Sequence, residues 1–374
     1  MSFRIPSRSY RFDEFIDLVL AQELPSFARF KVGCYLTRWS SWEEKAPSLE
    51  MILEKNGIRV EDLGEIKRLV ASYRDRITKD TVTAVFYAYL SPETKLLICI
   101  TDEKAEAFEE TLDNVSRYST GFYHMFIGNS TFNYISHKIV EMDPQNQCTY
   151  FSARYLPSLM KKSEFRPDRR RTLVYYAPDG DGLEALKELR QFYGVLPRVM
   201  RFRLIDLGIF EIKSTGLFTL WSEGGTLEAR KKLLDLASMT LENVLKIRKI
   251  IETSEYKLVP VKTDERIFEV PRLTPWIINF SKSLNDEQIG LLFEILDAED
   301  FTLFNYGKAT ENSFRVNGMV IDRNKHNLFT IDISNRQIIV APYGEMVFDS
   351  FLRFYQMVVE RLDPESEIKE FEEN

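Results

Sequence analysis

The sequence is poor in the residue types that most often form metal and redox sites. It contains 3 cysteines and 3 histidines among 374 residues, and no histidine has a cysteine, histidine or carboxylate at ligand spacing. The cysteines lie far apart and form no CxxC pair: Cys34, Cys99 and Cys148. Cys99 falls in an apolar run, where a buried free thiol is the ordinary interpretation. We therefore expect no metal site and no small-molecule cofactor.

Long apolar segments are also missing. No run of roughly 18 apolar residues occurs, so we expect no transmembrane helix. Arg4 and Arg8 lie near the start of the chain, but no apolar stretch of the kind found in signal peptides follows them. These observations predict a cytoplasmic protein without a membrane partner.

Linear motifs of catalysis are absent as well. We find no GxGxxG, Walker loop, GxSxG or HExxH pattern, so we expect a protein that is not an enzyme. One partial pattern remains, because Asp206, Glu211 and Lys213 resemble the D…ExK set with which metal-dependent nucleases hold Mg²⁺ and activate water. The spacing between Asp206 and Glu211 is short for that set, so a nuclease is our third hypothesis.

The residues that are present are typical of a folded, highly charged protein. Hydrophobic residues make up 44%, aromatic residues 13% and charged residues 29%. Abundant Lys and Glu with 7 Gln is a bias met in thermophile proteins. The net charge of -7 disfavours general attraction to nucleic acid. From Tyr150 to Ile205, however, 12 basic and 6 acidic residues give a net charge of +6, which leaves -13 for the rest of the chain.

The order of expected helices and strands predicts an α+β fold. An amphipathic segment near Phe15 begins a helical N-terminal region, the alternation from Thr81 to Leu90 begins a hairpin, and Phe122 to Val140 is expected to be a second stretch of strands. We expect a helical N-terminal region, a β-containing unit with a hairpin and a helix, a basic linker, two sheet-and-helix repeats and a frayed acidic tail, at residues 1–80, 81–156, 157–172, 173–255, 267–362 and 363–374.

Two expected helices in the N-terminal region are joined at Gly57, which suits a left-handed helix end. They span Leu49–Asn56 and Glu61–Tyr73. A DNA-reading helix-turn-helix also joins two helices by a short turn that often contains glycine, and it is one interpretation of this segment. The second helix would begin with carboxylates, which phosphates repel, so we favour plain helical packing.

The second half of the chain contains one pattern twice: strand, helix, antiparallel strands, long helix. In the first copy, Asp181 and Glu184 predict a capping box and Gly194 predicts the end of the helix. The second copy runs from Trp276 to about Leu362. Its last helix has apolar residues at intervals of three and four, which predicts that it lies across a sheet.

This order of elements resembles one half of a TATA-binding protein core. The resemblance is best from Ile209 to Arg230, where a strand, a Ser-Thr-Gly turn, a strand, a glycine bend and a helix follow one another, and it covers roughly Leu173 to Leu362. In that family two halves form a saddle whose underside binds the minor groove of DNA. The resemblance implies a saddle whose exposed sheet binds DNA or protein. Glu211 and Asp332 fall on its expected strands and favour protein.

Basic and aromatic residues around the linker carry the strongest binding signal. If the strand with Arg201 and Arg203 lies beside the linker, its arginines can follow a phosphate backbone while tyrosines stack on bases. The alternative is a solvated linker beside an edge strand guarded by charge. The candidate nucleic-acid-binding residues are Lys161, Lys162, Arg166, Arg169, Arg170, Arg171, Tyr175, Tyr176, Arg198, Arg201 and Arg203.

We therefore predict a non-enzymatic binding subunit associated with DNA or RNA. Its basic strip contacts a phosphate backbone, and another surface docks a partner protein. A protein–protein interaction scaffold without nucleic acid is the alternative hypothesis.

Overall fold

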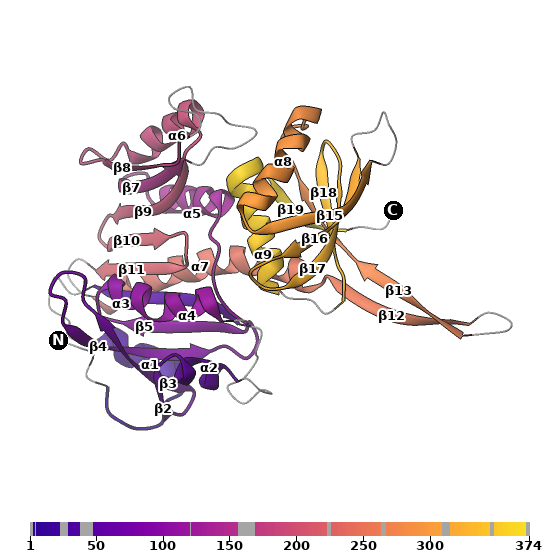
Figure 1. The fold of residues 1–374 in the computed structure, drawn as a ribbon. Coiled ribbons are helices and arrows are strands. Elements are labelled where there is room, and N and C mark those ends of the chain that lie inside the picture. Colours follow the sequence, from indigo (N-terminus) through magenta and orange to yellow (C-terminus); the bar gives the residue numbers. More distant parts are fainter. Residues whose placement is uncertain are drawn as a thin grey trace.

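The computed structural model describes residues 3, 5–22, 29–37, 48–119, 121–155, 169–222, 226–262, 267–308, 315–344 and 348–371. They form an α+β fold, as predicted, with two antiparallel sheets, helices packed on them, and a two-stranded arm (Figure 1). None of the described helices combines the length and apolar character needed to cross a bilayer.

The larger sheet has eleven strands, and its neighbouring strands pair antiparallel. The order is β2-β3-β4-β5-β1-β11-β10-β9-β7-β8, with β6 beside β1. β1 pairs with β11, beginning with Phe30 opposite Leu220. This pairing joins the first half of the sheet, made of β1 to β6, to the second half, made of β7 to β11. The strands are β1 (Phe30–Thr37), β2 (Arg59–Leu63), β3 (Ile66–Arg74), β4 (Thr81–Leu90), β5 (Leu96–Thr101), β6 (Phe122–His124), β7 (Gln147–Tyr155), β8 (Arg171–Tyr176), β9 (Leu196–Leu204), β10 (Gly208–Lys213) and β11 (Leu217–Ser222).

Helices cover the two faces of this sheet unequally. One face is packed along both halves by α1 (Phe12–Ala21), α5 (Asn129–Met142), α6 (Gly182–Tyr193) and α7 (Leu227–Glu252). The other face is packed over the first half, by α2 (Leu49–Lys55), α3 (Ala105–Glu110) and α4 (Leu112–Tyr118). Figure 1 accordingly shows α3 and α4 in front of the first half, whereas β9, β10 and β11 have no helix in front of them.

Two buried arginines on α7 hold neighbouring elements in place. Arg230 donates hydrogen bonds of 2.6 Å to the carbonyls of Leu20 and Gln22, at the end of α1. Arg248 donates to the carbonyls of Thr37 (2.5 Å) and Thr94 (2.7 Å), at the end of β1 and in the β4–β5 turn. Each buried guanidinium is thus hydrogen-bonded to backbone oxygens, and that of Arg248 also pairs with Glu252 at 2.8 Å.

The C-terminal unit is built on the smaller sheet. Its order is β15-β16-β17-β18-β14-β19, and its helices pack on one face around Trp276, Phe329 and Phe351. Its core is continuous with that of the larger sheet, for example where Tyr355 meets Phe126. The elements are β14 (Trp276–Asn279), α8 (Asp286–Ala298), β15 (Phe301–Lys308), β16 (Val316–Asp322), β17 (Asn327–Ile333), β18 (Gln337–Pro342), α9 (Phe348–Met357), the π-helix η1 (Val358–Leu362) and β19 (Glu367–Glu370).

The predicted second repeat has the predicted order of elements. The unit that shares its connectivity is the first half of the larger sheet, and not the predicted first repeat. In the C-terminal unit the first strand pairs with the fifth, giving the order β15-β16-β17-β18-β14. The first half of the larger sheet has the same connectivity, with β1, α2 and then β2-β3-β4-β5. The predicted repeat at 173–255 is not a separate unit, because its strands pair with β7 and, through β11, with β1.

The prediction that residues 1–80 are helical is wrong beyond α1 and α2. The segment from Glu61 to Tyr73 forms strands β2 and β3, which excludes a helix-turn-helix here. Gly64, with φ +83°, makes the tight turn between them. Leu69, Ala71 and Tyr73 are buried at alternate positions of β3, which is the period of a strand and not of a helix.

Three smaller predictions are also wrong. The stretch Phe122–Val140 contains β6 and then helix α5, where we expected strands. The acidic tail is not simply frayed, because β19 pairs with β14. Asp181 does not cap α6 with its side chain, because its carboxylate accepts a 2.8 Å hydrogen bond from the hydroxyl of Tyr175.

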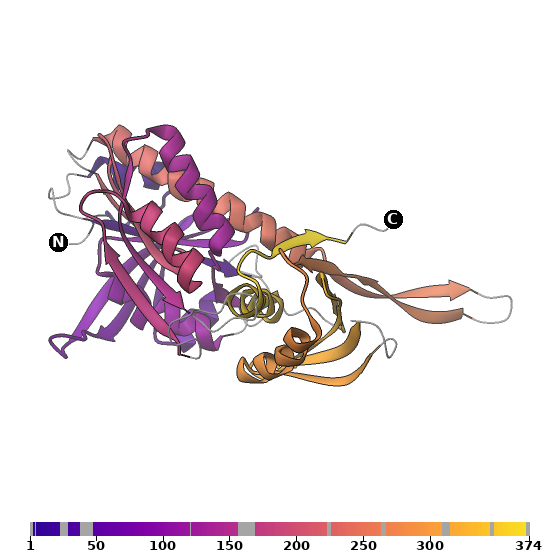
Figure 2. The same cartoon turned by 90° about the horizontal axis from the view of Figure 1, so that it is seen from above.

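Strands β12 (Glu255–Lys262) and β13 (Ile267–Thr274) form an arm that the sequence did not predict. The arm extends away from both sheets (Figure 2). Every residue of β13 is exposed, including Phe268 and Val270. Pro260 pairs with Glu269 and Pro271 pairs with Leu258, two positions apart along the ladder, so both prolines are in pairs of the same type. Proline has no N–H to donate, so each occupies a position whose backbone nitrogen points away from the partner strand. The two edges are therefore blunted, and the arm presents apolar side chains on its faces.

Two phenylalanines test this description of the arm. Phe268 is 50% exposed and Phe329 is fully buried. We expect Phe268→Ala to change the free energy of unfolding by less than about 0.5 kcal/mol, and Phe329→Ala to lower it by about 3–5 kcal/mol. Urea unfolding of the two variants measures both values. A large loss with Phe268→Ala would show that the arm packs on the body.

Candidate nucleic-acid interface

The second half of the larger sheet has one face without a helix on it, within the part of the chain that the structure describes. Its side chains alternate along the strands with the core residues on the other face, and most are half-buried or exposed. We call this surface the open face. It consists of Tyr176 on β8, Tyr150, Ser152 and Arg154 on β7, Val199, Arg201 and Arg203 on β9, and Ile209, Glu211 and Lys213 on β10.

A row of aromatic and charged side chains crosses the open face. Strand register places Tyr176 beside Tyr150, Tyr150 beside Arg201, and Arg201 beside Glu211. The two tyrosine rings lie 5.2 Å apart, and the guanidinium of Arg201 lies 4.9 Å from the Tyr150 ring centre. Arg201 also pairs with Glu211 at 2.6 Å, which holds it flat across the sheet. Tyr176 is 72% exposed, so one ring face is available to a ligand.

Arg203 adds a free cation to this surface. It follows Arg201 by two residues on β9, so both side chains point to the open face. Arg203 is exposed and has no ion-pair partner among the described residues. Arg203 is paired with Ile209 on β10, and Ile209 is paired in turn with Trp221 on β11. The guanidinium of Arg29 lies 5.1 Å from the ring centre of Trp221. The far end of the open face is therefore basic and aromatic.

Two of the predicted residues lie on the opposite face. Tyr175 stacks on Phe151 with ring centres 5.3 Å apart, and its hydroxyl is bonded to Asp181. Arg171 packs over the Tyr155 ring at 4.6 Å. These contacts place Arg171 and Tyr175 beside α6, where they contribute to packing, and they separate them from Tyr176, Arg201 and Arg203.

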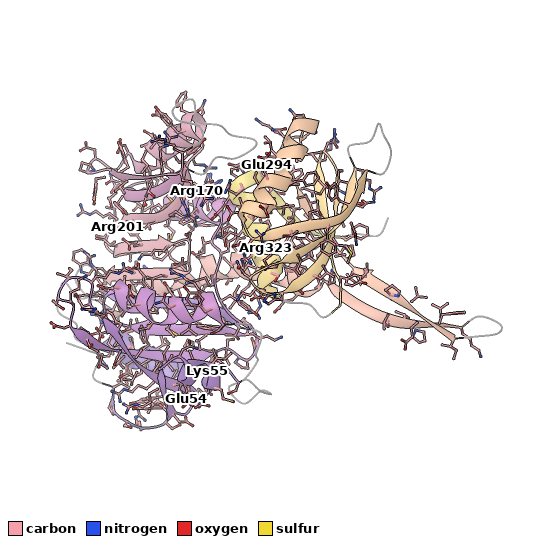
Figure 3. The ribbon with its side chains drawn as sticks, viewed as in Figure 1. Glu54, Lys55, Arg170, Arg201, Glu294 and Arg323 are labelled. Carbon is pink, nitrogen blue, oxygen red and sulfur yellow. The ribbon has the colours of Figure 1, made fainter. Side chains whose placement is uncertain are left out.

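Arg170 and Arg198 lie at the junction of the two sheets. Arg170 pairs with Glu299 of the C-terminal unit at 3.3 Å, and Arg198 pairs with Glu360 at 2.7 Å. Arg198 is the extra residue of a β-bulge opposite β7, which turns its side chain towards the C-terminal unit. Figure 3 shows Arg170 on the side of the larger sheet that faces that unit, and Arg201 farther from the unit.

The remaining predicted residues are in the linker. Arg169 lies in a bend just before β8 and is exposed. Three others lie outside the described residues: Lys161, Lys162 and Arg166. Sequence reasoning missed Tyr150 and Arg154, because it did not interpret 147–155 as a strand. The alternation of Phe151, Ala153 and Tyr155 with polar residues was the available signal.

The three residues of the nuclease hypothesis are engaged separately. Glu211 is paired with Arg201, and Lys213 is paired with Glu109 of α3 at 3.1 Å. Asp206 lies in the β9–β10 turn with φ +59°, about 10 Å along the strand from Glu211. The described residues contain no group of three or more His, Cys, Asp or Glu side chains placed to hold a metal ion.

Among the described residues, the smaller sheet also has a face without helices, with a hollow of about 360 Å³. Its lining includes Met319, Thr330, Ile339 and Asp332, and Asp332 forms an ion pair with Arg315. This pairing neutralises the one carboxylate that the sequence placed there. The larger sheet therefore offers more cationic and aromatic surface than the smaller one.

Comparison with known proteins gives no activity. The AF_0896_M family middle domain matches residues 134–215, the segment from α5 to the end of β10 that carries most of the open face. An uncharacterized protein of Archaeoglobus fulgidus is 26% identical over 237 residues, covering 60% of this chain. The chain spans 61% of the length of that relative. No solved structure matches the chain.

The row of the open face ends in a buried lysine, which gives a prediction about pH. Beyond Glu211 the row continues through Thr219 to Lys31 on β1, whose ammonium donates to the carbonyl of Glu103. Burial lowers the pKa of Lys31 to about 8, against a partial upward effect from Asp102. The folded state therefore disfavours the charged ammonium relative to the unfolded chain.

The free energy of unfolding of the wild type should rise relative to that of Lys31→Met as the pH rises from about 8 to about 10.5. Below about pH 8 the buried ammonium is charged and destabilises the folded state. This destabilisation is relieved as the pH rises, and the relief is complete above the ordinary pKa of lysine. Its full size is about 3 kcal/mol. Urea unfolding of both proteins at pH 7.5, 9 and 10 measures it, and a constant difference between them would contradict the buried, shifted lysine.

Proposed function

We propose that this chain is a nucleic-acid-binding protein that holds a single strand of DNA or RNA across the open face. The observation that carries the proposal is the row of Tyr176, Tyr150 and Arg201 on a sheet face without a covering helix. An exposed aromatic ring stacks on an unpaired base regardless of its identity, and arginines beside it attract the backbone. A duplex hides its base faces, so the row favours a single strand.

The net charge of -7 does not oppose this proposal. Charges separated by more than about 8–10 Å are largely screened at physiological salt, so the local charge of the face matters more than the total. The open face carries Arg154, Arg201, Arg203 and Lys213, of which Arg201 pairs with Glu211 and Lys213 pairs with Glu109 of α3. Arg154 and Arg203 have no ion-pair partner among the described residues, and they lie on β7 and β9 near the tyrosine row. A nucleic-acid strand can therefore meet both kinds of contact at once.

Removing the exposed ring tests the stacking contact. We expect Tyr176→Ala to weaken binding of a labelled single-stranded oligonucleotide by about 1–3 kcal/mol, or roughly 5- to 150-fold. Fluorescence anisotropy with DNA and RNA at two salt concentrations measures it. The matched control is Phe192→Ala, because Phe192 is 60% exposed on α6, on the opposite face. Equal effects of the two variants, or no binding by the wild type at low salt, would overturn the proposal.

Removing the free cation tests the backbone contact. Arg203→Ala should weaken binding to all sequences alike and should lower the slope of log affinity against log salt by about 0.7. The control is Arg59→Ala, because Arg59 is an exposed arginine on β2, at the other edge of the sheet. An unchanged slope for Arg203→Ala would show that the strand does not follow β9.

A second candidate function, a protein-interaction scaffold, is favoured by the arm. Leu258, Ile267 and Phe268 are at least half exposed on it, and the two prolines disfavour strand addition at its edges. Such an arm suits insertion into an apolar cleft of a partner protein, which would contact the two faces of the arm. Partners captured by the wild type and lost with Phe268→Ser would support this function, provided that oligonucleotide affinity is unchanged. Identical capture by both proteins would contradict it.

A further inference from the structure

Arg154 is the least compensated cation at the junction of the two sheets. It points to the open face near the end of β7 and is half-buried. It lies close enough to the pairs Arg198–Glu360 and Arg170–Glu299 to interact electrostatically with all four side chains. No hydrogen-bond or ion-pair partner for Arg154 exists among the described residues. Burial, followed by the repulsion from Arg198, lowers the pKa of its guanidinium.

The junction as a whole has an excess of positive charge. Arg361 of η1 shares the carboxylate of Glu299 with Arg170. The described cluster thus brings together four arginines and two glutamates from the larger sheet and the C-terminal unit. Arg154 is the arginine of this cluster without a described counter-ion, and it lies in a partly desolvated position, where an unpaired charge costs free energy unless an anion joins it. Guanidinium groups that converge from two directions suit the tetrahedral oxygens of a phosphate.

We propose that the junction binds a phosphate group of the bound nucleic-acid strand, with Arg154 as its central ligand. This inference rests on the proposed function, because the strand is the source of the phosphate. Arg154 follows Tyr150 by four residues on the same face of β7, a separation of about 13 Å. A strand whose base stacks on Tyr150 can therefore place a later phosphate at Arg154. The bound nucleic-acid strand would then contact the C-terminal unit as well as the larger sheet.

The variant Arg154→Gln separates a binding role from a packing role. Without ligand, its melting temperature should equal or exceed that of the wild type, because an uncompensated charge has been removed. Oligonucleotide affinity should fall several-fold, and the slope of log affinity against log salt should fall by about 0.7. The control Arg59→Gln should change neither value. A lower melting temperature with unchanged affinity would show that Arg154 is structural and would overturn the inference.

A second measurement identifies the source of the phosphate. Inorganic phosphate, added at constant ionic strength against chloride, should raise the melting temperature of the wild type and leave that of Arg154→Gln unchanged. A phosphate effect that depends on Arg154, in a protein that binds no oligonucleotide, would assign the site to free phosphate; the proposed function would then fail while the site stands. Oligonucleotide binding lost with Tyr176→Ala but unaffected by Arg154→Gln would leave the proposed function standing and would overturn this inference.

Discussion

The pairing of β1 with β11 is the constraint on which the rest of the structure depends. It brings together residues that are about 190 positions apart, such as Phe30 and Leu220, and merges two halves into one sheet. A merged sheet buries the edges that each half would otherwise expose. It also requires one continuous helical layer, which α7 supplies together with α1 and α5. Arg230 and Arg248 fix α7, which follows β11 of the second half, to α1 and β1 of the first half, so the layer and the seam support each other.

The uneven supply of helices then produces the open face. The first half has α2, α3 and α4 between or after its strands, and they cover its second face. The second half uses α6 and α7 on the shared core side, so Tyr150, Arg201 and Glu211 remain uncovered. The candidate interface therefore follows from topology. The C-terminal unit closes one end of this face and contributes Glu299 and Glu360 to the junction.

Local signals predicted a good part of this fold from the sequence. The C-terminal unit was predicted element by element, and its helix α8 begins with a capping box at Asn285. On the larger sheet, α6 ends at the left-handed Gly194, as predicted. The hairpin β2–β3 was mistaken for a helix because its apolar residues were counted without the turn at Gly64. The arm was missed because its stability does not come from a buried face, so no periodic pattern marks it.

The candidate site was predictable in type and not in place. Arginines and tyrosines around the linker were identified, but alternation along β8 sends Tyr175 and Tyr176 to opposite faces, and a one-residue shift in register decides which is exposed. A bulge redirects Arg198 to Glu360, which no linear pattern reveals. Tyr150 and Arg154 come from a strand that pairs with β9, 42 to 56 residues further along the chain. Long-range pairing, which sequence patterns do not specify, decided the composition of the face.

The most direct test of the central claim is photo-crosslinking of the wild-type chain to a single-stranded oligonucleotide, followed by peptide mapping. The account predicts that crosslinks concentrate on β7, β8 and β9, at Tyr150, Tyr176 and their neighbours. Crosslinks confined to the smaller sheet or to the arm, or their complete absence at low salt, would contradict it.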